Sequence, residues 1–260
     1  MNIREIVGIA PNYSLINRKE RNFAAILFAA LCKPGNSERF LSYCEYHPDF
    51  GDDFGIYVEY SYLRDLWNSL KDENVKKEII RQHLRINNID DILDQPIVEI
   101  NRKFGVGGSP SRDFIQYPGK WAIINYNNNF PDNADFLKIC RFKWSFNIKP
   151  DIVIHLNKSK AICIEAKYES REGQYPASGL EKDIFKKREV PYIGQMELQK
   201  YMMEELLGIK TDFMFLVFKK EQSDTHKVVS WSEAFGCLDL SELPPFAIEM
   251  AGRISNSQSL

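Results

Sequence analysis

The chain has 260 residues, 44% of them hydrophobic and 27% charged, and a formal net charge of −2 at pH 7. This composition is ordinary for a globular protein, and the length allows one large α/β domain or a core domain that carries an insertion. A near-neutral balance argues against a protein that coats nucleic acid non-specifically, because such proteins are far more basic. No window approaches the roughly 18 uncharged apolar residues of a membrane span, and the N-terminus lacks a secretory-signal pattern, so we expect a cytoplasmic protein with no membrane partner.

Cysteine usage points to the same compartment. The five cysteines form no CxxC pair, and the chain has only four histidines. This pattern argues against a structural zinc site and favours reduced, mostly buried thiols.

The N-terminal part is predicted to be mainly helical. A first helix is expected from about residue 18 to 32, with Asn17 as its cap and Lys-Pro-Gly at 33–35 as its stop. Residues 36–100 also favour helices separated by short polar joints. We therefore expect a single domain over 1–260 that contains a mainly helical insertion over 36–100.

A loop and a further helix follow the expected insertion. Residues 105–120 are rich in Gly, Ser and Pro, which predicts a loop. A flexible loop is favoured over a phosphate-binding loop, because no apolar strand precedes the glycines and no GK[ST] ends them. A helix is expected over 134–146.

Two β-rich runs then flank a hairpin signal. Residues 151–156 (DIVIHL) and 161–168 (AICIEAKY) are separated by Asn-Lys-Ser-Lys. We expect these runs to form two antiparallel strands.

The remainder predicts a crossover followed by a buried strand. A polar loop over 169–190 leads to a helix that Gly208 ends, and the apolar run 211–218 is typical of a buried strand. A short strand near 228–229 and a small helix from Ser232 follow, and the polar tail 252–260 is expected to fray. The fold class is therefore α/β, with a mixed sheet flanked by helices.

Three charged residues on the predicted hairpin form the candidate site. Asp151 follows Pro150 at the start of one strand, and Glu165-x-Lys167 lies on the next. Because side chains alternate along a strand, Glu165 and Lys167 are expected on one face. Charges in strands this apolar require a partner, since burying unpaired charge is costly.

The turn decides whether the two acids meet. A three-residue loop, or a bulge, places Asp151 directly opposite Glu165 on the same face. A plain two-residue turn would instead place Asp151 opposite Ala166, on the wrong face. The metal interpretation therefore requires the three-residue loop or a bulge, and the sequence permits either.

Paired carboxylates favour a divalent cation. Two carboxylates a few ångströms apart repel unless a cation lies between them, and hard oxygen ligands favour Mg²⁺, with Mn²⁺ expected to substitute. The cation would polarise a phosphate and orient hydroxide, and Lys167 would contact the phosphate or position the attacking water. The backbone carbonyl of Ala166 is a further candidate ligand. The alternative is a buried Asp/Glu–Lys ion-pair group without a metal.

The stretch from about Lys149 to Phe218 resembles the PD-(D/E)XK nuclease superfamily, which includes restriction endonucleases, Holliday-junction resolvases and RecB-type exonucleases. The resemblance rests on Pro150-Asp151 and Glu165-x-Lys167, and it covers well under half of the chain. It implies a restriction-endonuclease-like αβββαβ core and a divalent metal held by these residues.

Further candidates come from the same resemblance. In many members a glutamate on the first core helix joins the metal site, and Glu20 is the candidate; the alternative is a capping box with Asn17. RecB-type members carry Gln and Tyr one turn apart on the helix after the Glu-x-Lys strand. Here Gln195 and Tyr201 are six positions apart, so the pattern is not reproduced cleanly. His155 lies on the Asp151 face and is a candidate proton shuttle, although a lone strand histidine is more often structural.

Basic residues outside the hairpin are candidates for phosphate contacts. One group surrounds the Gly-rich loop and another precedes the Gln195 helix; the residues selected are Arg112, Lys120, Lys187 and Arg188, together with Tyr201 as a nucleic-acid contact. The alternative for each group is a solvated surface. Glu59, Asp52 and Asp53 are left unassigned.

Together these features predict Mg²⁺-dependent hydrolysis of phosphodiester bonds in DNA, by an endonuclease or exonuclease. A homodimer or a larger defence or repair complex is compatible with the superfamily. The rivals are a non-catalytic nucleic-acid-binding or complex-forming protein on the same fold, and an RNA-directed nuclease.

Overall fold

The computed structural model describes residues 20–47, 50, 53–167, 173–218 and 226–256. These residues form two compact units. The first comprises the described parts of Met1–Glu59, Pro150–Arg171 and Asp212–Leu260, and the second those of Tyr60–Lys149 and Glu172–Thr211. Along the sequence, the second unit therefore interrupts the first twice.

The first unit contains the five-stranded sheet, in the order β1-β2-β3-β6-β7. Its strands are β1 (Gly55–Val58), β2 (Ile152–Asn157), β3 (Lys160–Ala166), β6 (Lys210–Val217) and β7 (Lys227–Ser230). The β1–β2 and β2–β3 pairs are antiparallel, whereas β6 and β7 are parallel. The prediction of an α/β fold with a mixed sheet is confirmed, as are the hairpin and the buried strand after it.

Strand β1 was not predicted from the sequence. Residues 55–58 lie within the segment expected to be helical, yet Gly55 pairs with His155 and Val58 pairs with Ile152. The next helix, α4 (Tyr62–Ser69), begins only after this strand. A strand of four residues carries too little alternation to be recognised, and its partner lies about 100 residues further along the chain.

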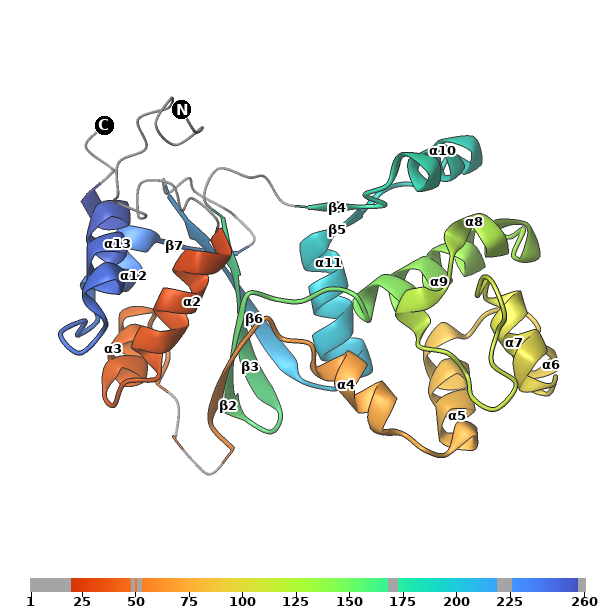
Figure 1. Cartoon of the computed structure of the whole chain (residues 1–260), viewed down its shortest axis with the longest axis horizontal. Coiled ribbons are helices and arrows are strands. Elements are labelled where there is room, and N and C mark those ends of the chain that lie inside the picture. Colours follow the sequence, from red (N-terminus) through yellow and green to blue (C-terminus); the bar gives the residue numbers. More distant parts are fainter. Residues whose placement is uncertain (1–19, 48–49, 51–52, 168–172, 219–225, 257–260) are drawn as a thin grey trace, which may run out of the picture. The chain divides into compact units, whose positions relative to one another are not determined.

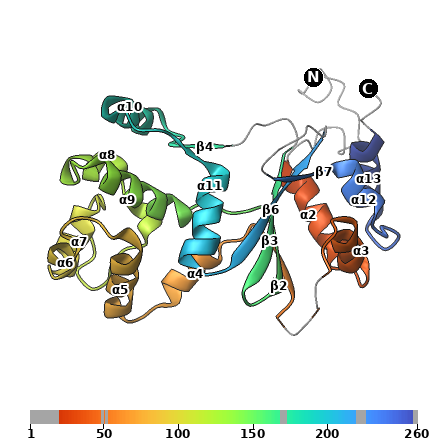
Figure 2. The same cartoon turned by 180° about the vertical axis from the view of Figure 1, so that it is seen from behind.

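Four helices lie on the same side of the sheet, as the two opposite views show (Figure 1, Figure 2). They are α2 (Glu20–Leu31), α3 (Asn36–Tyr43), α12 (Trp231–Gly236) and α13 (Pro245–Asn256). The core they cover includes Leu27, Ile154 and Ile162, all fully buried. Alternation therefore turns one face of the β2–β3 hairpin into this apolar core and leaves the opposite face to Asp151 and Glu165.

The C-terminal segment is more ordered than its composition predicts. Residues 252–256 continue α13, where Ala251 and Ile254 are buried, whereas 257–260 lie outside the described residues. Fraying was expected from polarity, but the apolar positions of this helix pack into the core of the first unit.

The second unit is mainly helical. Its helices are α4, α5 (Glu73–Leu84), α6 (Ile89–Leu93), α7 (Ile97–Lys103), α8 (Ile123–Tyr126), α9 (Asn133–Ser145), α10 (Gly179–Arg188) and α11 (Gln195–Lys200). Shorter elements are the 3-10 turns η2 (Pro118–Lys120) and η3 (Asn127–Asn129), the π-helix η4 (Tyr201–Leu206), and the strands β4 (Gln174–Tyr175) and β5 (Ile193–Gly194). Within the described residues, no helix is both long and apolar enough to cross a membrane.

Several boundaries of the helical part differ from those expected. Residues 36–59 belong to the first unit, and the helical unit extends past residue 100 to Lys149 and resumes at Glu172. Helix α10 occupies much of the stretch 169–190 that was expected to be a polar loop. Its start is capped by Ser178, whose hydroxyl accepts a hydrogen bond from the backbone N–H of Glu181. The helix was missed because its sequence is mostly charged and shows little apolar periodicity.

Candidate active site

The register of the β2–β3 hairpin places the two candidate acids opposite each other. Ile152 pairs with Ile164, so the next position on each strand pairs Asp151 with Glu165. Near the turn the pairing changes to Asn157 with Lys160, with a register shift after His155. The hairpin thus combines a two-residue turn with a bulge, which is one of the two arrangements that bring the acids to one face.

The turn itself has a local cause. The side-chain oxygen Oδ1 of Asn157 accepts hydrogen bonds from the backbone N–H of Ser159 at 2.9 Å and from its hydroxyl at 3.1 Å. An Asn side chain that bonds two residues ahead stabilises a tight turn. The short turn forces the extra residue into the strand, and the resulting bulge sets the register of the candidate site.

The charged groups on this face are in direct contact. The Nζ of Lys167 lies 2.8 Å from Oε1 of Glu165, and the two side chains are 13% and 4% exposed. The Oδ2 of Asp151 accepts a hydrogen bond of 2.8 Å from the backbone N–H of Ala166. One carboxylate is therefore paired with an amine, and the other is oriented by the backbone of the facing strand.

Neighbouring elements fix the backbone of Lys167 on both sides. Its N–H donates to the carbonyl of Leu216 in β6 at 2.7 Å, and its carbonyl accepts from the indole Nε1 of Trp231 at 3.1 Å. Trp231 is fully buried at the start of α12 and packs against Phe23 of α2, with ring centroids 5.8 Å apart. Trp231 thus positions the residue that follows β3, a role that no sequence motif indicated.

A third acid lies beside Asp151. The backbone N–H of Glu59, directly after β1, donates to the carbonyl of Asp151 at 2.9 Å. Its carboxylate pairs with Nε of Arg21 at 3.1 Å. The sequence left Glu59 unassigned because β1 was not predicted; an acid one residue beyond a short β-branched run was the available signal.

This environment favours the protonated form of Asp151. Burial, followed by the nearby charges of Glu165 and Glu59, raises the pKa of Asp151 to about 7, although the Ala166 hydrogen bond and Lys167 act in the opposite direction. Removing a carboxylate from water and placing it beside other carboxylates disfavours its charged form. A positive charge close to Asp151 would act in the opposite direction, because it favours the charged carboxylate.

The candidate metal ligands Glu20, Asp151 and Glu165 lie on three different elements or strand ends. Among the described residues, no three His, Cys, Asp or Glu side chains are placed to share one metal ion. Glu20 lies in the first turn of α2 and is half-buried; the capping box proposed for it involves Asn17, which lies outside the described residues. The two candidate acids that the structure brings together are Asp151 and Glu165.

His155 lies at the turn end of the hairpin. It is four residues from Asp151 along β2, a separation of about 13 Å. Its ring contacts Tyr57 edge-on at a centroid distance of 5.3 Å, and burial lowers its pKa. This position does not suit a proton shuttle for Asp151.

Gln195 and Tyr201 lie in the second unit. The Oε1 of Gln195 accepts a hydrogen bond of 3.3 Å from the backbone N–H of Gly173, which ties the start of α11 to the chain before β4. Tyr201 begins η4 and lines a pocket of about 490 Å³ together with His83 and Arg141. Burial raises the pKa of the Tyr201 hydroxyl to about 12.

The basic candidates also lie in the second unit and have different environments. Arg188 bonds the side chain of Asn127 at 2.6 Å and the carbonyl of Phe130 at 2.8 Å, and its guanidinium stacks 4.1 Å from the ring centre of Phe136. Arg188 therefore holds neighbouring segments of this unit together. Arg112 and Lys187 are exposed, and Lys120 lines a further pocket.

Comparison of the chain with known protein families, with curated proteins and with solved structures finds no match.

Proposed function

We propose that this chain is a metal-dependent nuclease that hydrolyses phosphodiester bonds, with DNA as the substrate. The observation that carries the proposal is the arrangement on the β2–β3 hairpin: Asp151 opposite Glu165, with the Lys167 amine 2.8 Å from Glu165. These are the residues on which the resemblance to the PD-(D/E)XK superfamily rests.

The order of elements supports the same proposal. Helix α2 is followed along the chain by β1, β2 and β3, and later by α11 and β6. With the intervening elements left out, this order matches the αβββαβ order that the resemblance implies, with α11 belonging to the second unit and the sheet to the first. Strand β1, which the sequence-based prediction missed, would be the first of the three strands in that order.

The donor set fits a hard divalent cation. Mg²⁺ commonly binds one or two protein carboxylates and completes its shell with water and substrate phosphate. Asp151 and Glu165 supply two carboxylates, and the Ala166 carbonyl is the proposed third oxygen. When bound, the cation would polarise the scissile phosphate and lower the pKa of a bound water.

Each residue then has a distinct task. Asp151 and Glu165 would hold the cation, and the Ala166 N–H keeps the Asp151 carboxylate in one orientation. Without a cation, the Lys167 amine forms an ion pair with the Glu165 carboxylate. With Glu165 engaged by a cation, the Lys167 amine would be available to the phosphate, where its positive charge would complement the charge that develops during hydrolysis.

A second candidate is a non-catalytic nucleic-acid-binding protein on the same fold. The Lys167–Glu165 ion pair favours it, because the two side chains are 13% and 4% exposed and satisfy each other without a metal. A buried ion pair can be retained without any catalytic role. Metal binding and cleavage separate the two candidates.

The experiment uses the purified full chain with plasmid, single-stranded DNA and RNA, in Mg²⁺, Mn²⁺ or EDTA. We expect cleavage of DNA with either cation and none with EDTA. Lys167→Ala and Asp151→Asn should each reduce the rate by about 100-fold or more. Lys158→Ala is the matched control, since Lys158 lies in the turn of the same hairpin and its side chain is 83% exposed.

Three outcomes discriminate among the candidates. Equal activity in Lys167→Ala and Lys158→Ala would remove Lys167 from the mechanism. Preferential cleavage of RNA would replace the DNA assignment with an RNA-directed nuclease. DNA binding without cleavage, together with Mn²⁺ binding that Asp151→Asn does not weaken, would favour the non-catalytic protein.

A further inference from the structure

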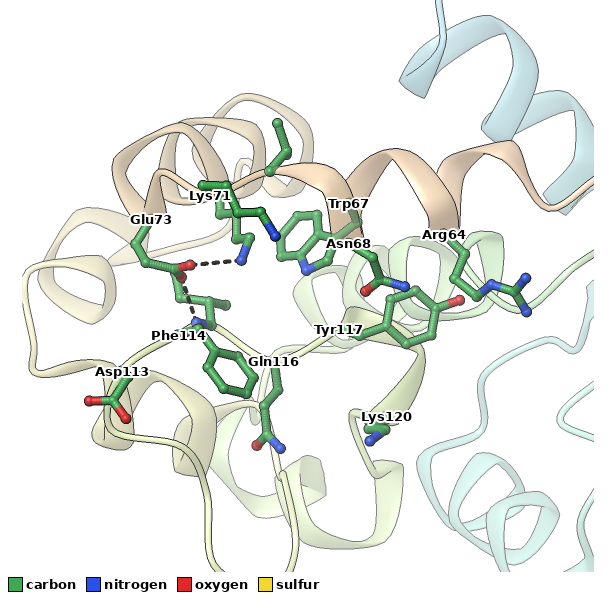
Figure 3. A pocket seen from close by; sticks show the side chains of 13 residues that line it. Arg64, Trp67, Asn68, Lys71, Glu73, Asp113, Phe114, Gln116, Tyr117 and Lys120 are labelled. Carbon is green, nitrogen blue, oxygen red and sulfur yellow. Dashed lines mark hydrogen bonds and ion pairs between the residues drawn. The ribbon is translucent and has the colours of Figure 1, made fainter.

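A pocket of about 680 Å³ lies within the second unit, apart from the residues of the candidate active site. It is formed by α4, the start of α5 and the segment 113–120, and Figure 3 shows its side chains. The residues that carry the argument are Trp67, Lys71, Phe114, Gln116, Tyr117 and Lys120. Its volume is in the range of pockets that hold small organic ligands.

Two polar atoms of this pocket are buried without a hydrogen-bond partner among the described residues: Nε1 of Trp67 and Oε1 of Gln116. Trp67 is only 3% exposed, and Figure 3 shows the nitrogen-bearing edge of its indole turned toward the space that Phe114, Gln116 and Tyr117 border. A buried donor or acceptor without a partner costs about 1–3 kcal/mol. A ligand carrying both an acceptor and a donor would satisfy these two atoms.

The rim of the pocket carries positive charge. Lys71 and Lys120 are exposed and have no ion-pair partner among the described residues. The acid Glu73 is already engaged, since it accepts from Lys76 at 2.7 Å and from the backbone N–H of Ile115 at 2.6 Å. Asp113 also lines the pocket and is exposed, so the two lysines outnumber this one remaining acid. The charge left for a ligand is therefore net positive, which favours an anion such as phosphate.

An aromatic surface lies between the two lysines. Phe114 is 49% exposed, and in Figure 3 Lys71 and Lys120 lie on opposite sides of its ring. Tyr117 borders the same space, and its ring is held by an edge-on contact with Phe146 at 5.7 Å. An exposed aromatic ring beside cations is suited to a planar, negatively charged ligand.

The segment that forms one wall is held in place by two side chains. The buried Asn101 amide donates to the carbonyls of Ser111 and Phe114, each at 3.0 Å, and accepts from the N–H of Gln116 at 2.9 Å. Glu73 fixes Ile115 as described above. The Gly-rich stretch predicted as a loop is thus anchored where it lines the pocket, so the ligand groups are positioned before binding.

We infer that this pocket binds one nucleotide of a nucleic-acid strand. The base stacks on Phe114, and its polar edge meets the Trp67 N–H and the Gln116 side chain. Lys71 and Lys120 meet the phosphates on either side of the nucleotide. A nucleobase is planar and carries both donors and acceptors, so it matches the aromatic wall and the two unpartnered atoms together. A free nucleotide has the same chemistry, and the test distinguishes the two sources.

Binding is measured on the full chain in EDTA, by fluorescence anisotropy of short labelled single-stranded DNA of each base. Lys71→Gln and Lys120→Gln should each weaken binding about tenfold, equivalent to about 1.4 kcal/mol. Trp67→Phe keeps an aromatic ring and removes the N–H, and it should weaken binding by a similar factor. Lys77→Gln is the matched control, because Lys77 lies on α5 but does not line the pocket.

Competition then identifies the source of the nucleotide. If deoxynucleoside monophosphates compete as well as the unlabelled oligonucleotide, the ligand is a free nucleotide. If the oligonucleotide competes more strongly, the ligand is a nucleotide within a strand. Both results support a nucleotide pocket. Equal competition by inorganic phosphate, no binding at millimolar concentration, or an equal loss in Lys77→Gln would overturn the inference. Because EDTA is present, failure here and failure of the nuclease proposal are separate results.

Discussion

Replacing Asp151 with asparagine should remove a pH-dependent loss of stability. The pKa of Asp151 is raised from its ordinary value of 3.8 to about 7, mainly by burial and then by Glu165 and Glu59. The folded state therefore binds this proton more tightly than the unfolded state. Its contribution to stability is fully present below about pH 4 and is lost as the pH rises through about 7.

The size of this effect follows from the two pKa values. Each tenfold change in acidity is worth about 1.4 kcal/mol, so a rise from 3.8 to about 7 gives an upper limit of about 4 kcal/mol. Asp151 is partly exposed, which screens its charge, so we expect roughly half of this limit, about 2 kcal/mol. Asparagine retains an acceptor for the Ala166 N–H and removes only the charge.

The assay is urea unfolding followed by circular dichroism between about pH 4 and pH 9, with and without Mg²⁺. The native chain should lose about 2 kcal/mol more than Asp151→Asn over this range, and Mg²⁺ should restore the native chain but not the variant. Glu38→Gln is the control, because Glu38 is an exposed acid on α3 of the same unit. Parallel pH profiles of the native chain and Asp151→Asn would refute this reasoning.

Three further substitutions test the packing around the sites by the same unfolding measurement. Arg188→Ala should cost about 2 kcal/mol because it strips buried carbonyls of a charged donor, whereas exposed Lys187→Ala should stay within about 0.5 kcal/mol; equal effects would contradict a structural role for Arg188. Ser230→Ala removes the capping box of α12 and should cost about 1 kcal/mol, and an unchanged stability would show that the cap is dispensable. Gly105→Ala should cost about 3 kcal/mol, since φ is +77° and a Cβ would lie 2.6 Å from the Ala122 carbonyl oxygen. An unchanged stability would contradict this backbone conformation at residue 105.

Much of the candidate site could be predicted from local pattern. Alternation along β3 placed Glu165 and Lys167 on one face, and the apolar run that became β6 identified the strand beside them. The sequence left open whether Asp151 joins that face, because a two-residue turn and a bulged turn predict opposite faces. The bulge between His155 and Asn157 decides it.

Other features depend on residues that are distant in sequence. Glu59 reaches Asp151 only because β1 pairs with a strand about 100 residues away, and Trp231 reaches Lys167 from beyond β7. Arg188 was predicted to contact phosphate. Its side chain instead bonds the Asn127–Phe130 segment, which lies about 60 residues earlier in the sequence.

The sequence by itself determined the β2–β3 hairpin, the apolar face of α2 and the identity of the charged residues, since each depends on the periodicity of neighbouring side chains. Tertiary structure decided which acid faces which, how far Lys167 is committed to Glu165, and that a cationic aromatic pocket forms beside the Gly-rich segment. The physical reason is that periodicity specifies the face on which a side chain lies. Register, burial and pKa are set by the packing of segments far apart in the chain.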